Sequence, residues 1–266
     1  APKGTPTVVP SAFAVRALTE AAVDLGDESY LNAARGACEF ILRGLNRTEE
    51  TDEEVCWSYS PLDHTRVFNA SLLAAEALAS VGALTGESDL KAWAVRGARY
   101  VARRQSADGS WAYGAEGFQS WSDNFHTAFI LTSLARIIRT CKDTLPVFDG
   151  APAELDDALR RGYEFWRQAF FLEDARPRYY HDRDYPSDAH SAGAAVVALL
   201  ELADLDASAR DFARRVALWA IRNLRDPRGF FYYQRGRFYT IRTPYMRWSQ
   251  AWMLYALARL GEESKQ

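Results

Sequence analysis

The stretch that decides the fold runs from Arg66 to Gly82 and reads RVFNASLLAAEALASVG. Small and apolar residues occupy nearly every face of this helix, and a helix of that kind is surrounded by protein. Four other stretches share the composition, and the five begin at residues 10, 66, 124, 188 and 245. The step between successive starts is roughly 57 residues, which is typical of a helical repeat. We therefore interpret these stretches as five inner helices.

Four more highly charged stretches alternate with the apolar ones and begin at residues 28, 88, 154 and 207. Each carries apolar residues at the three and four spacing of an amphipathic helix, so each has one wet face. The alternation predicts an all-α fold, an α/α toroid that is either incomplete or a six-hairpin barrel. An irregular helical bundle or an open solenoid is the alternative. Gly26, Gly82 and Gly261 are predicted to end helices.

Loops rich in glycine and aromatic residues follow the charged helices and lead into the apolar ones. Residues 225–244 read RDPRGFFYYQRGRFYTIRTP and predict a β-hairpin that turns at Gln234-Arg235-Gly236. In a toroid the loops would meet at one face, so we expect short β-hairpins and the functional site there.

The composition excludes several classes of protein. The chain has 266 residues with a formal net charge of −3, which is less basic than a nucleic-acid binder requires. No apolar run approaches the length of a membrane span, and no signal peptide opens the sequence, so a cytoplasmic location is expected. Cys38 and Cys141 lie in helical patterns and are expected to be buried thiols. We expect residues 1–266 to form a single toroidal domain of a longer chain, and the oligomeric state is left open.

The segment Gln105-Ser-Ala-Asp108-Gly109-Ser110-Trp111 resembles the Q-x-x-D-G-S-W element of terpenoid cyclases and prenyltransferases of the α/α-toroid superfamily. In that superfamily the glutamine and tryptophan tie the end of an outer helix to the following turn. The resemblance therefore implies the fold. The acidic D-x-D-D run of the cyclases and the zinc ligands of the prenyltransferases are not evident here, so the resemblance implies no activity.

A second resemblance lies closer to chemistry. Asn124-Phe125-His126-Thr127 is similar to the Asn/His element of α/α-toroid polysaccharide lyases, which act on uronate polymers. The segments DGSWAYG, SDNFHTAF, SDAHSA and PYMRWSQAW are similar to uncharacterised toroid proteins of bacterial exopolysaccharide gene clusters. These resemblances imply a carbohydrate-active enzyme with a polysaccharide or oligosaccharide substrate.

Titratable residues gather at the predicted starts of the inner helices. Histidine carries protons near neutral pH, and paired carboxylates serve as acid and base. The candidate catalytic residues are Asp63, Asp123, His126, Asp188, His190 and Tyr245. The candidate substrate-binding residues are Trp57, Arg66, Asn69, Trp111, Tyr113, Trp121, Asn124, Arg247 and Trp248. For the three aspartates, helix capping is the competing interpretation. The spacing supports no metal site, and no cofactor is predicted.

The favoured chemistry is β-elimination or C5-epimerisation of a uronate-containing glycan. Arginine and asparagine would neutralise the substrate carboxylate, His126 or His190 would remove the C5 proton, and Tyr113 or Tyr245 would protonate the leaving oxygen. A glycoside hydrolase with paired aspartates is one alternative. A terpenoid cyclase or prenyltransferase and a non-catalytic glycan-binding toroid are the others.

Overall fold

The computed structural model describes residues 2–263, which divide into two compact units. Unit 1 comprises residues 1–120 and 133–161, and unit 2 comprises residues 121–132 and 162–266. Two helices, α5 (Asn124–Thr140) and α6 (Ala151–Ala169), begin in one unit and end in the other. The prediction of a single domain concerns how the units are joined, and it stays a prediction.

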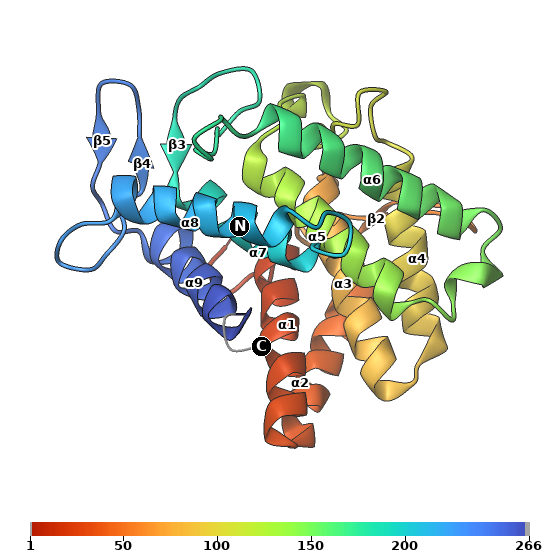
Figure 1. The fold of residues 1–266 in the computed structure, drawn as a ribbon. Coiled ribbons are helices and arrows are strands. Elements are labelled where there is room, and N and C mark those ends of the chain that lie inside the picture. Colours follow the sequence, from red (N-terminus) through yellow and green to blue (C-terminus); the bar gives the residue numbers. More distant parts are fainter. Residues whose placement is uncertain (1, 264–266) are drawn as a thin grey trace. The chain divides into compact units, whose positions relative to one another are not determined.

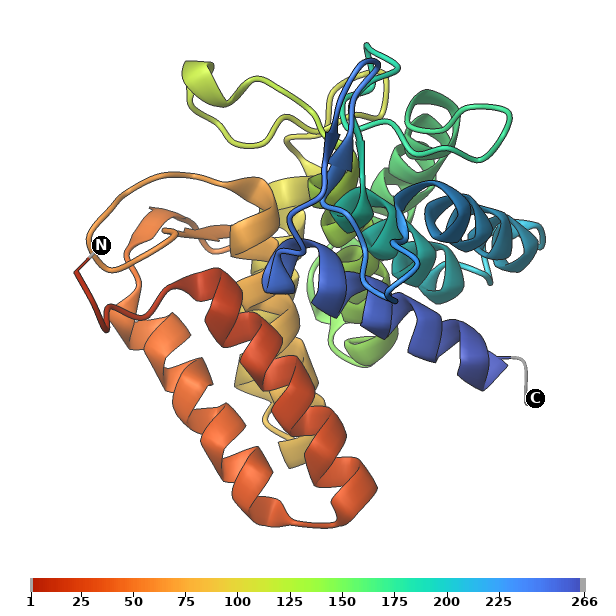
Figure 2. The same ribbon diagram turned by 90° about the vertical axis from the view of Figure 1, so that its left-hand side faces the viewer.

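Unit 1 is built from antiparallel helix pairs with one small hairpin (Figures 1 and 2). Its complete elements are α1 (Val8–Leu25), α2 (Glu28–Glu39), β1 (Arg47–Glu50), β2 (Val55–Trp57), α3 (Phe68–Thr85) and α4 (Ser88–Ala102). A π-helical turn over Phe40–Gly44 extends α2, and 3-10 turns cover Gly117–Gln119 and Leu145–Val147.

Unit 2 pairs its helices in the same way and carries a three-stranded sheet at one end (Figure 1). Its complete elements are β3 (Ser187–Asp188), α7 (Ala189–Glu201), α8 (Ala209–Leu224), β4 (Gln234–Arg235), β5 (Thr240–Ile241) and α9 (Ala251–Glu263), with a π-helical turn over Met246–Gln250 before α9. The sheet order is β3-β4-β5, and both pairings are antiparallel. The predicted fold class, all-α with short β-hairpins in the loops, is confirmed.

The prediction that protein surrounds the apolar helices is confirmed for α3 and α7. It is wrong for α1 and α9. Almost every side chain of α3 and α7 is buried. In α1 only one stripe is buried, and among residues 251–262 of α9 only Met253 and Ala256 are buried. The reason is that α1 packs on α2 and α3, whereas α9 packs mainly on α7, so each has neighbours on one side. By length and hydropathy α3 could cross a membrane, but 78% of it is buried inside the protein, as in a core helix.

One backbone hydrogen bond recurs at the start of four of the five apolar helices. The first residue of an apolar helix donates its N–H to the carbonyl of a tyrosine in the loop that follows the next charged helix. The pairs are Val8 with Tyr59, Phe68 with Tyr113, Asn124 with Tyr179 and Ala189 with Tyr233. The bond fixes each loop against the start of a helix one repeat earlier, so the residue before each helix occupies an equivalent position.

A five-residue turn also recurs where three of the charged helices end. In residues 106–110, 172–176 and 226–230 the first N–H donates to the last carbonyl, and the fourth N–H donates to the first carbonyl. The fourth residue has a positive φ in every copy, 89° at Gly109, 65° at Ala175 and 102° at Gly229. Because glycine adopts such angles without steric cost, Ala175 is the strained copy.

The Q-x-x-D-G-S-W element makes the contacts that the superfamily resemblance implies. Gln105 Nε2 donates to the carbonyls of Gly109 and Ala158, each at 2.9 Å. Trp111 Nε1 donates to the carbonyl of Val101 at 2.9 Å. The element thereby ties the end of α4 to its own turn and to α6.

Two of the predicted helix-ending glycines are wrong. Gly26 ends α1 with a φ of 65°, as expected, but Gly82 and Gly261 lie inside α3 and α9. A Cβ on Gly82 would lie 2.9 Å from the carbonyl oxygen of Glu87, so this glycine permits a close approach of the chain. Gly86, with a φ of 76°, ends α3 instead.

The predicted hairpin is present, but its turn lies further along the chain. Gln234 and Arg235 belong to β4, and the Gly236 N–H donates to the Tyr239 carbonyl at 2.9 Å across the turn. A Cβ on Gly236 would lie 2.2 Å from the Tyr239 ring. This glycine therefore makes room for a cross-strand ring.

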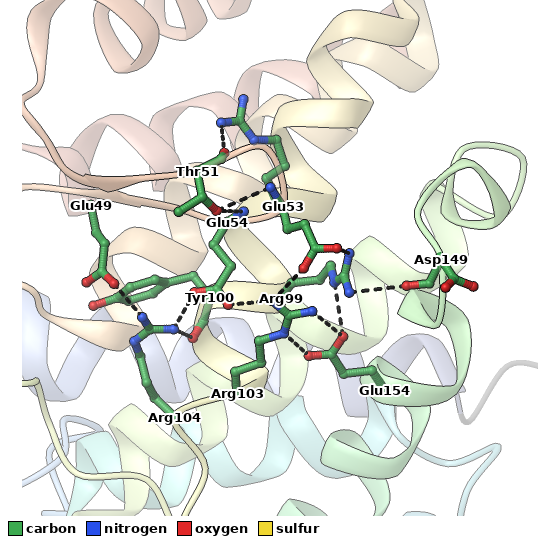
Figure 3. A network of polar contacts seen from close by, with 11 residues as sticks. Glu49, Thr51, Glu53, Glu54, Arg99, Tyr100, Arg103, Arg104, Asp149 and Glu154 are labelled. Carbon is green, nitrogen blue, oxygen red and sulfur yellow. Dashed lines mark hydrogen bonds and ion pairs between the residues drawn. The ribbon is translucent and has the colours of Figure 1, made fainter.

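Arginines of α4 hold the β1–β2 hairpin and α6 together (Figure 3). Arg103 bonds Glu54 and Glu154, each at 2.6 Å, and Arg99 bonds Glu154 at 3.0 Å. Arg104 bonds the other oxygen of Glu54 at 2.6 Å. These contacts explain why charged residues concentrate on the wet faces of the helices.

A second ionic cluster lies in the interior of unit 1. Glu76 of α3 accepts hydrogen bonds from Arg16 at 2.7 Å, Arg136 at 3.0 Å and Ser133 at 2.6 Å. Burial alone would raise the pKa of Glu76, but the two guanidinium groups and the hydroxyl lower it to about 2. The cluster therefore joins α1, α3 and α5 through a charge that stays ionised.

Candidate functional site

The start of α5 presents a histidine held by an aspartate. The buried Asp123 accepts the backbone N–H of His126 through Oδ1 at 3.0 Å, which caps the helix. Its Oδ2 lies 2.7 Å from His126 Nδ1 and also accepts Trp121 Nε1 at 3.2 Å. Because Nδ1 faces the carboxylate, proton transfer between His126 and a ligand would use Nε2. The aspartate thus caps the helix and orients the imidazole.

The start of α7 repeats the arrangement with different chemistry. Asp188 Oδ1 accepts the Ser191 N–H at 2.7 Å and caps the helix, while Oδ2 has no hydrogen-bond partner among the described residues. Burial raises the pKa of Asp188 to about 7, against the Ser191 hydrogen bond, and the nearby Asp123 raises it further. Asp188 therefore keeps its proton up to neutral pH.

His190 lies two residues further along α7 and is buried. Burial lowers its pKa to about 3, and the neighbouring His126 lowers it further, so the imidazole is neutral at physiological pH. Its Nε2 has no hydrogen-bond partner within residues 2–263. A neutral imidazole with an unpartnered nitrogen can accept a proton.

Aromatic rings enclose this imidazole. Phe125 stacks on His190 with ring centroids 4.2 Å apart, and Trp252 of α9 lies 5.3 Å away. Trp252 in turn stacks on Phe129 at 5.0 Å. The rings account for the desolvation that keeps His190 neutral. We call Asp123, His126, Asp188 and His190 the acid–imidazole cluster, and all four belong to unit 2.

Loop tyrosines stand beside the acid–imidazole cluster. Burial raises the pKa of Tyr179 well above its usual range, and Asp123 and Asp188 raise it further, which places its hydroxyl near both carboxyl groups. Burial and then Asp188 raise the pKa of Tyr233. Both phenols stay protonated and can donate a hydrogen bond.

Tyr179 was not among the site residues predicted from the sequence, and Tyr233 was expected only as part of the Phe-Phe-Tyr-Tyr stretch at residues 230–233 that would stack on sugar rings. The signal that could have found them is an aromatic or proline residue two positions before each loop tyrosine. It occurs as Trp57-Ser58-Tyr59, Trp111-Ala112-Tyr113, Pro177-Arg178-Tyr179 and Phe231-Tyr232-Tyr233. Of these four tyrosines, only Tyr113 was predicted to donate a proton.

The side chain of Asn124 makes all its hydrogen bonds to other groups of the protein. Its Nδ2 donates to the carbonyls of Phe170 and Arg178, at 3.3 and 2.9 Å, and its Oδ1 accepts Trp166 Nε1 at 3.0 Å. Its backbone N–H donates to Tyr179. The side chain is buried with its amide satisfied, so it holds the Tyr179 loop rather than facing a ligand.

Three predicted polar residues belong to unit 1. Asp63 organises its own loop: it accepts Ser60 Oγ at 2.5 Å and Thr65 Oγ1 at 2.6 Å, and α3 begins five residues later. Arg66 is paired with Glu116 at 3.2 Å. Asn69 is buried in the first turn of α3, and its Oδ1 has no hydrogen-bond partner among the described residues.

The predicted aromatic residues divide by burial. Trp57 and Trp111 are buried in unit 1, and Tyr113 is half-buried there. Trp121, Tyr245 and Trp248 belong to unit 2 and are exposed, as is Arg247. The structure thus brings together Asp123, His126, Asp188 and His190 in one unit, and the exposed ring of Trp121 contacts this cluster through Asp123.

A metal site is not formed by the described residues. No group of three or more His, Cys, Asp or Glu side chains within residues 2–263 is placed to hold an ion. All three cysteines are buried and unpaired by disulfides, which confirms the burial predicted for Cys38 and Cys141.

Comparison with known proteins reveals the fold. No protein-family model matches the chain, and no curated protein matches it by sequence. Among solved structures, a sugar epimerase from a ruminal bacterium is similar with a TM-score of 0.79 and 14% identity, over 99% of this chain and 72% of that one. Unsaturated glucuronyl hydrolase from Bacillus sp. GL1 follows with a TM-score of 0.73 and 16% identity, over 95% of this chain and 74% of that one.

A third similar structure is cellobiose 2-epimerase from Bacillus thermoamylovorans, with a TM-score of 0.69 and 15% identity, over 95% of this chain and 72% of that one. The chain has the fold of these enzymes. The likeness confirms the predicted α/α-toroid fold class. At such identities it establishes the fold alone.

Proposed function

We propose that this protein is a carbohydrate-active enzyme that moves a proton on and off a sugar carbon. The observation that carries the proposal is the pair of imidazoles in one cluster, His126 oriented by a carboxylate and His190 kept neutral by burial. Epimerisation requires one group to remove a proton and a second group to return one. The fold shared with two sugar epimerases and a glucuronyl hydrolase supports a sugar as the substrate.

The substrate we favour is a uronate-containing glycan. Removal of the C5 proton places negative charge on the carboxylate, which must be stabilised by hydrogen bonds or by a cation. The protonated Asp188 can donate such a bond, and Arg247 is the predicted cation that lies in the same unit. Tyr179 adds a phenol beside both aspartates.

The steps follow from these groups. The neutral imidazole of His190 takes the C5 proton, and the electron pair of the C–H bond moves into the carboxylate as an enolate. If His126, in the imidazolium form that its pairing with Asp123 favours, returns the proton on Nε2 to the opposite face, the product is the C5 epimer. If the 4-oxygen leaves instead, with a proton donated by Tyr179 or Tyr245, the product is an unsaturated uronate and the reaction is a β-elimination.

Hydrolysis is a second candidate function because the two aspartates differ in state. Asp188 holds a proton near neutral pH, whereas Asp123 is engaged by His126. A protonated and a second carboxyl group near one another are the acid and base that glycoside hydrolysis uses. The likeness to unsaturated glucuronyl hydrolase favours keeping this candidate.

Incubation with uronate oligosaccharides in deuterium oxide tests the proposal. Epimerisation should place deuterium at C5, elimination should produce ultraviolet absorbance from the unsaturated ring, and hydrolysis should release reducing ends without carbon-bound deuterium. His126→Ala and His190→Gln should each slow exchange by about a hundredfold or more. Arg43→Gln on the exposed end of α2 is the matched control. Absence of exchange, elimination and hydrolysis on every sugar tested would leave the non-catalytic glycan-binding alternative in place of this proposal.

A further inference from the structure

The charge of the C-terminal segment differs from that of the rest of the chain. Residues 227–261 contain six arginines and no aspartate or glutamate, although the whole chain has a net charge of −3. Arg237, Arg242 and Arg247 take part in no ion pair within the described residues. A surface segment with arginines of this kind attracts anions.

Exposed aromatic residues lie between these arginines in the sequence. Tyr245 and Trp248 are 40% and 44% exposed, and the tip of the β4–β5 hairpin carries Phe238 and Tyr239, which are more exposed still. The hairpin projects from the helices of unit 2 (Figure 1). Exposed large rings cost free energy in water, and their grouping marks a binding surface.

Three rings of this segment form one cluster. The ring of Tyr233 lies 5.1 Å from Tyr245 and 5.9 Å from Trp248, and Tyr245 lies 5.2 Å from Trp248. We call these three residues the aromatic platform. Arg247 lies between Tyr245 and Trp248 in the sequence and is itself exposed. The π-helical turn Met246–Gln250 therefore carries both an exposed guanidinium group and one of the three rings.

A glutamine preforms the aromatic platform. Gln250 accepts the Phe231 N–H at 3.0 Å and donates to the Phe231 carbonyl at 2.7 Å. These two bonds pin the loop that carries Tyr233 to the helical turn that carries Tyr245 and Trp248. A platform held in place before binding loses less entropy when a ligand arrives.

The aromatic platform adjoins the acid–imidazole cluster. The Ala189 N–H, next to Asp188, donates to the carbonyl of Tyr233 at 3.0 Å, and Asp188 acts electrostatically on the Tyr233 phenol. A chain of linked sugars could therefore occupy both places at once. The platform would hold a residue next to the one that reacts.

We infer that the aromatic platform, together with Arg247, is a subsite for a sugar residue of an anionic oligosaccharide. A pyranose ring has an apolar face that packs on an aromatic ring, and a uronate carboxylate pairs with a guanidinium group. The inference rests on the proposed function in taking a glycan as the ligand. It adds that the substrate is an oligomer or polymer, recognised outside the reacting residue.

Affinity electrophoresis in native gels tests the subsite. The whole protein is run through gels that contain alginate, polygalacturonate or hyaluronate, with neutral dextran as the reference polymer. We expect at least one anionic polymer to retard the protein and dextran to leave it unaffected. Trp248→Ala and Arg247→Gln should each raise the apparent dissociation constant by about tenfold.

Matched controls separate this effect from a general loss of surface. Leu254→Ala removes an exposed apolar side chain from α9, and Arg43→Gln removes an exposed guanidinium group from unit 1. Both should migrate as the parent protein does. The inference is overturned if no anionic polymer retards the protein, or if the Trp248→Ala and Arg247→Gln variants both bind as tightly as the parent. It is also overturned if single-stranded DNA retards the protein and the glycans do not.

A catalytic variant distinguishes this inference from the proposed function. His126→Ala should still be retarded by the polymer and should change the apparent dissociation constant less than Trp248→Ala does, because His126 lies outside the aromatic platform. Retardation without any proton exchange in the parent would refute the proposed reaction and keep the subsite. Proton exchange on a monosaccharide without retardation by any polymer would refute the subsite and keep the reaction.

Discussion

Replacement of Asp188 with asparagine should stabilise the protein at alkaline pH and not at acid pH. The aspartate is fully buried, and its pKa rises from 3.8 to about 7 on folding. Between these values the folded protein binds a proton that the unfolded chain has lost, so the free energy of unfolding falls as the pH rises. Above pH 7 the ionised carboxylate remains buried, at a cost of about 4 kcal/mol relative to the unfolded chain.

Asparagine removes this cost and keeps the local structure. Its Oδ1 can accept the Ser191 N–H as Asp188 does, and asparagine and aspartate cap helices about equally well. Below about pH 4 both side chains are neutral in the folded and in the unfolded protein, and the two proteins should have similar stability. At pH 5 the variant should already be more stable by about 1.6 kcal/mol, because the unfolded aspartate has lost its proton and must take it up again on folding. At pH 9 the variant should be more stable by up to about 4 kcal/mol.

Urea unfolding at pH 5, 7 and 9, followed by circular dichroism, measures the difference. Asp206→Asn is the matched control, because the hydrogen bonds from Ser208 and Tyr163 outweigh burial and lower the pKa of Asp206. That variant should lose stability at neutral and alkaline pH, the opposite sign. An Asp188→Asn protein with the same stability difference at pH 5 and pH 9 would refute a raised pKa, and with it the assignment of Asp188 as a proton donor.

Three further predictions concern stability and are measured by urea or thermal unfolding. Asn124→Ala should cost about 3 kcal/mol, because it leaves Trp166 Nε1 and the Arg178 carbonyl without their side-chain partner and removes one of the two hydrogen bonds to the Phe170 carbonyl. Glu76→Gln should cost about 3 kcal/mol or more, because it leaves the partly buried guanidinium of Arg16 without a counter-charge. Gly229→Ala should cost about 1 kcal/mol, because its φ of 102° strains any side chain although a Cβ there meets no atom within 4 Å.

Each of these has a clear contrary result. An unchanged Asn124→Ala protein would show that the Tyr179 loop does not depend on the amide. If the Glu76→Gln protein unfolds at the same midpoint as the parent, the ionic cluster does not stabilise unit 1 and the prediction is wrong. For the glycine, Gly36→Ala in α2 is the comparison, because Gly36 is helical and a Cβ there also meets nothing, so that change should not destabilise.

Hydrophobic periodicity was enough to locate the helices, because the pattern depends on residues a few positions apart. The charged stretches beginning at residues 28, 88, 154 and 207 correspond to α2, α4, α6 and α8. The sequence pattern gave wrong predictions where a glycine makes room for a neighbouring group and does not form a turn. Gly82 and Gly236 make room for Glu87 and Tyr239, and that need is visible only when the neighbours are in place.

The candidate site was predictable in part for the same reason. Asp123 and Asp188 lie at helix starts, which sequence rules for capping predict. The role of Asn124 was not predictable, because its partners lie more than forty residues away. Tyr179 was missed because its nearness to the aspartates follows from pairing between repeats and not from local sequence.

The recurring bond from a helix start to a loop tyrosine separates framework from chemistry. The bond joins one backbone N–H to one backbone carbonyl, so it is indifferent to the side chain just before the helix. The position just before the helix is occupied by Thr7, Val67, Asp123 and Asp188 in the four repeats. Two of these residues are Thr and Val, and two are aspartates with different partners, His126 for Asp123 and Ser191 for Asp188. The residue at this position can therefore be substituted without loss of the backbone hydrogen bond that holds the loop. New pairs of acidic and basic side chains can be introduced into the other repeats in this way.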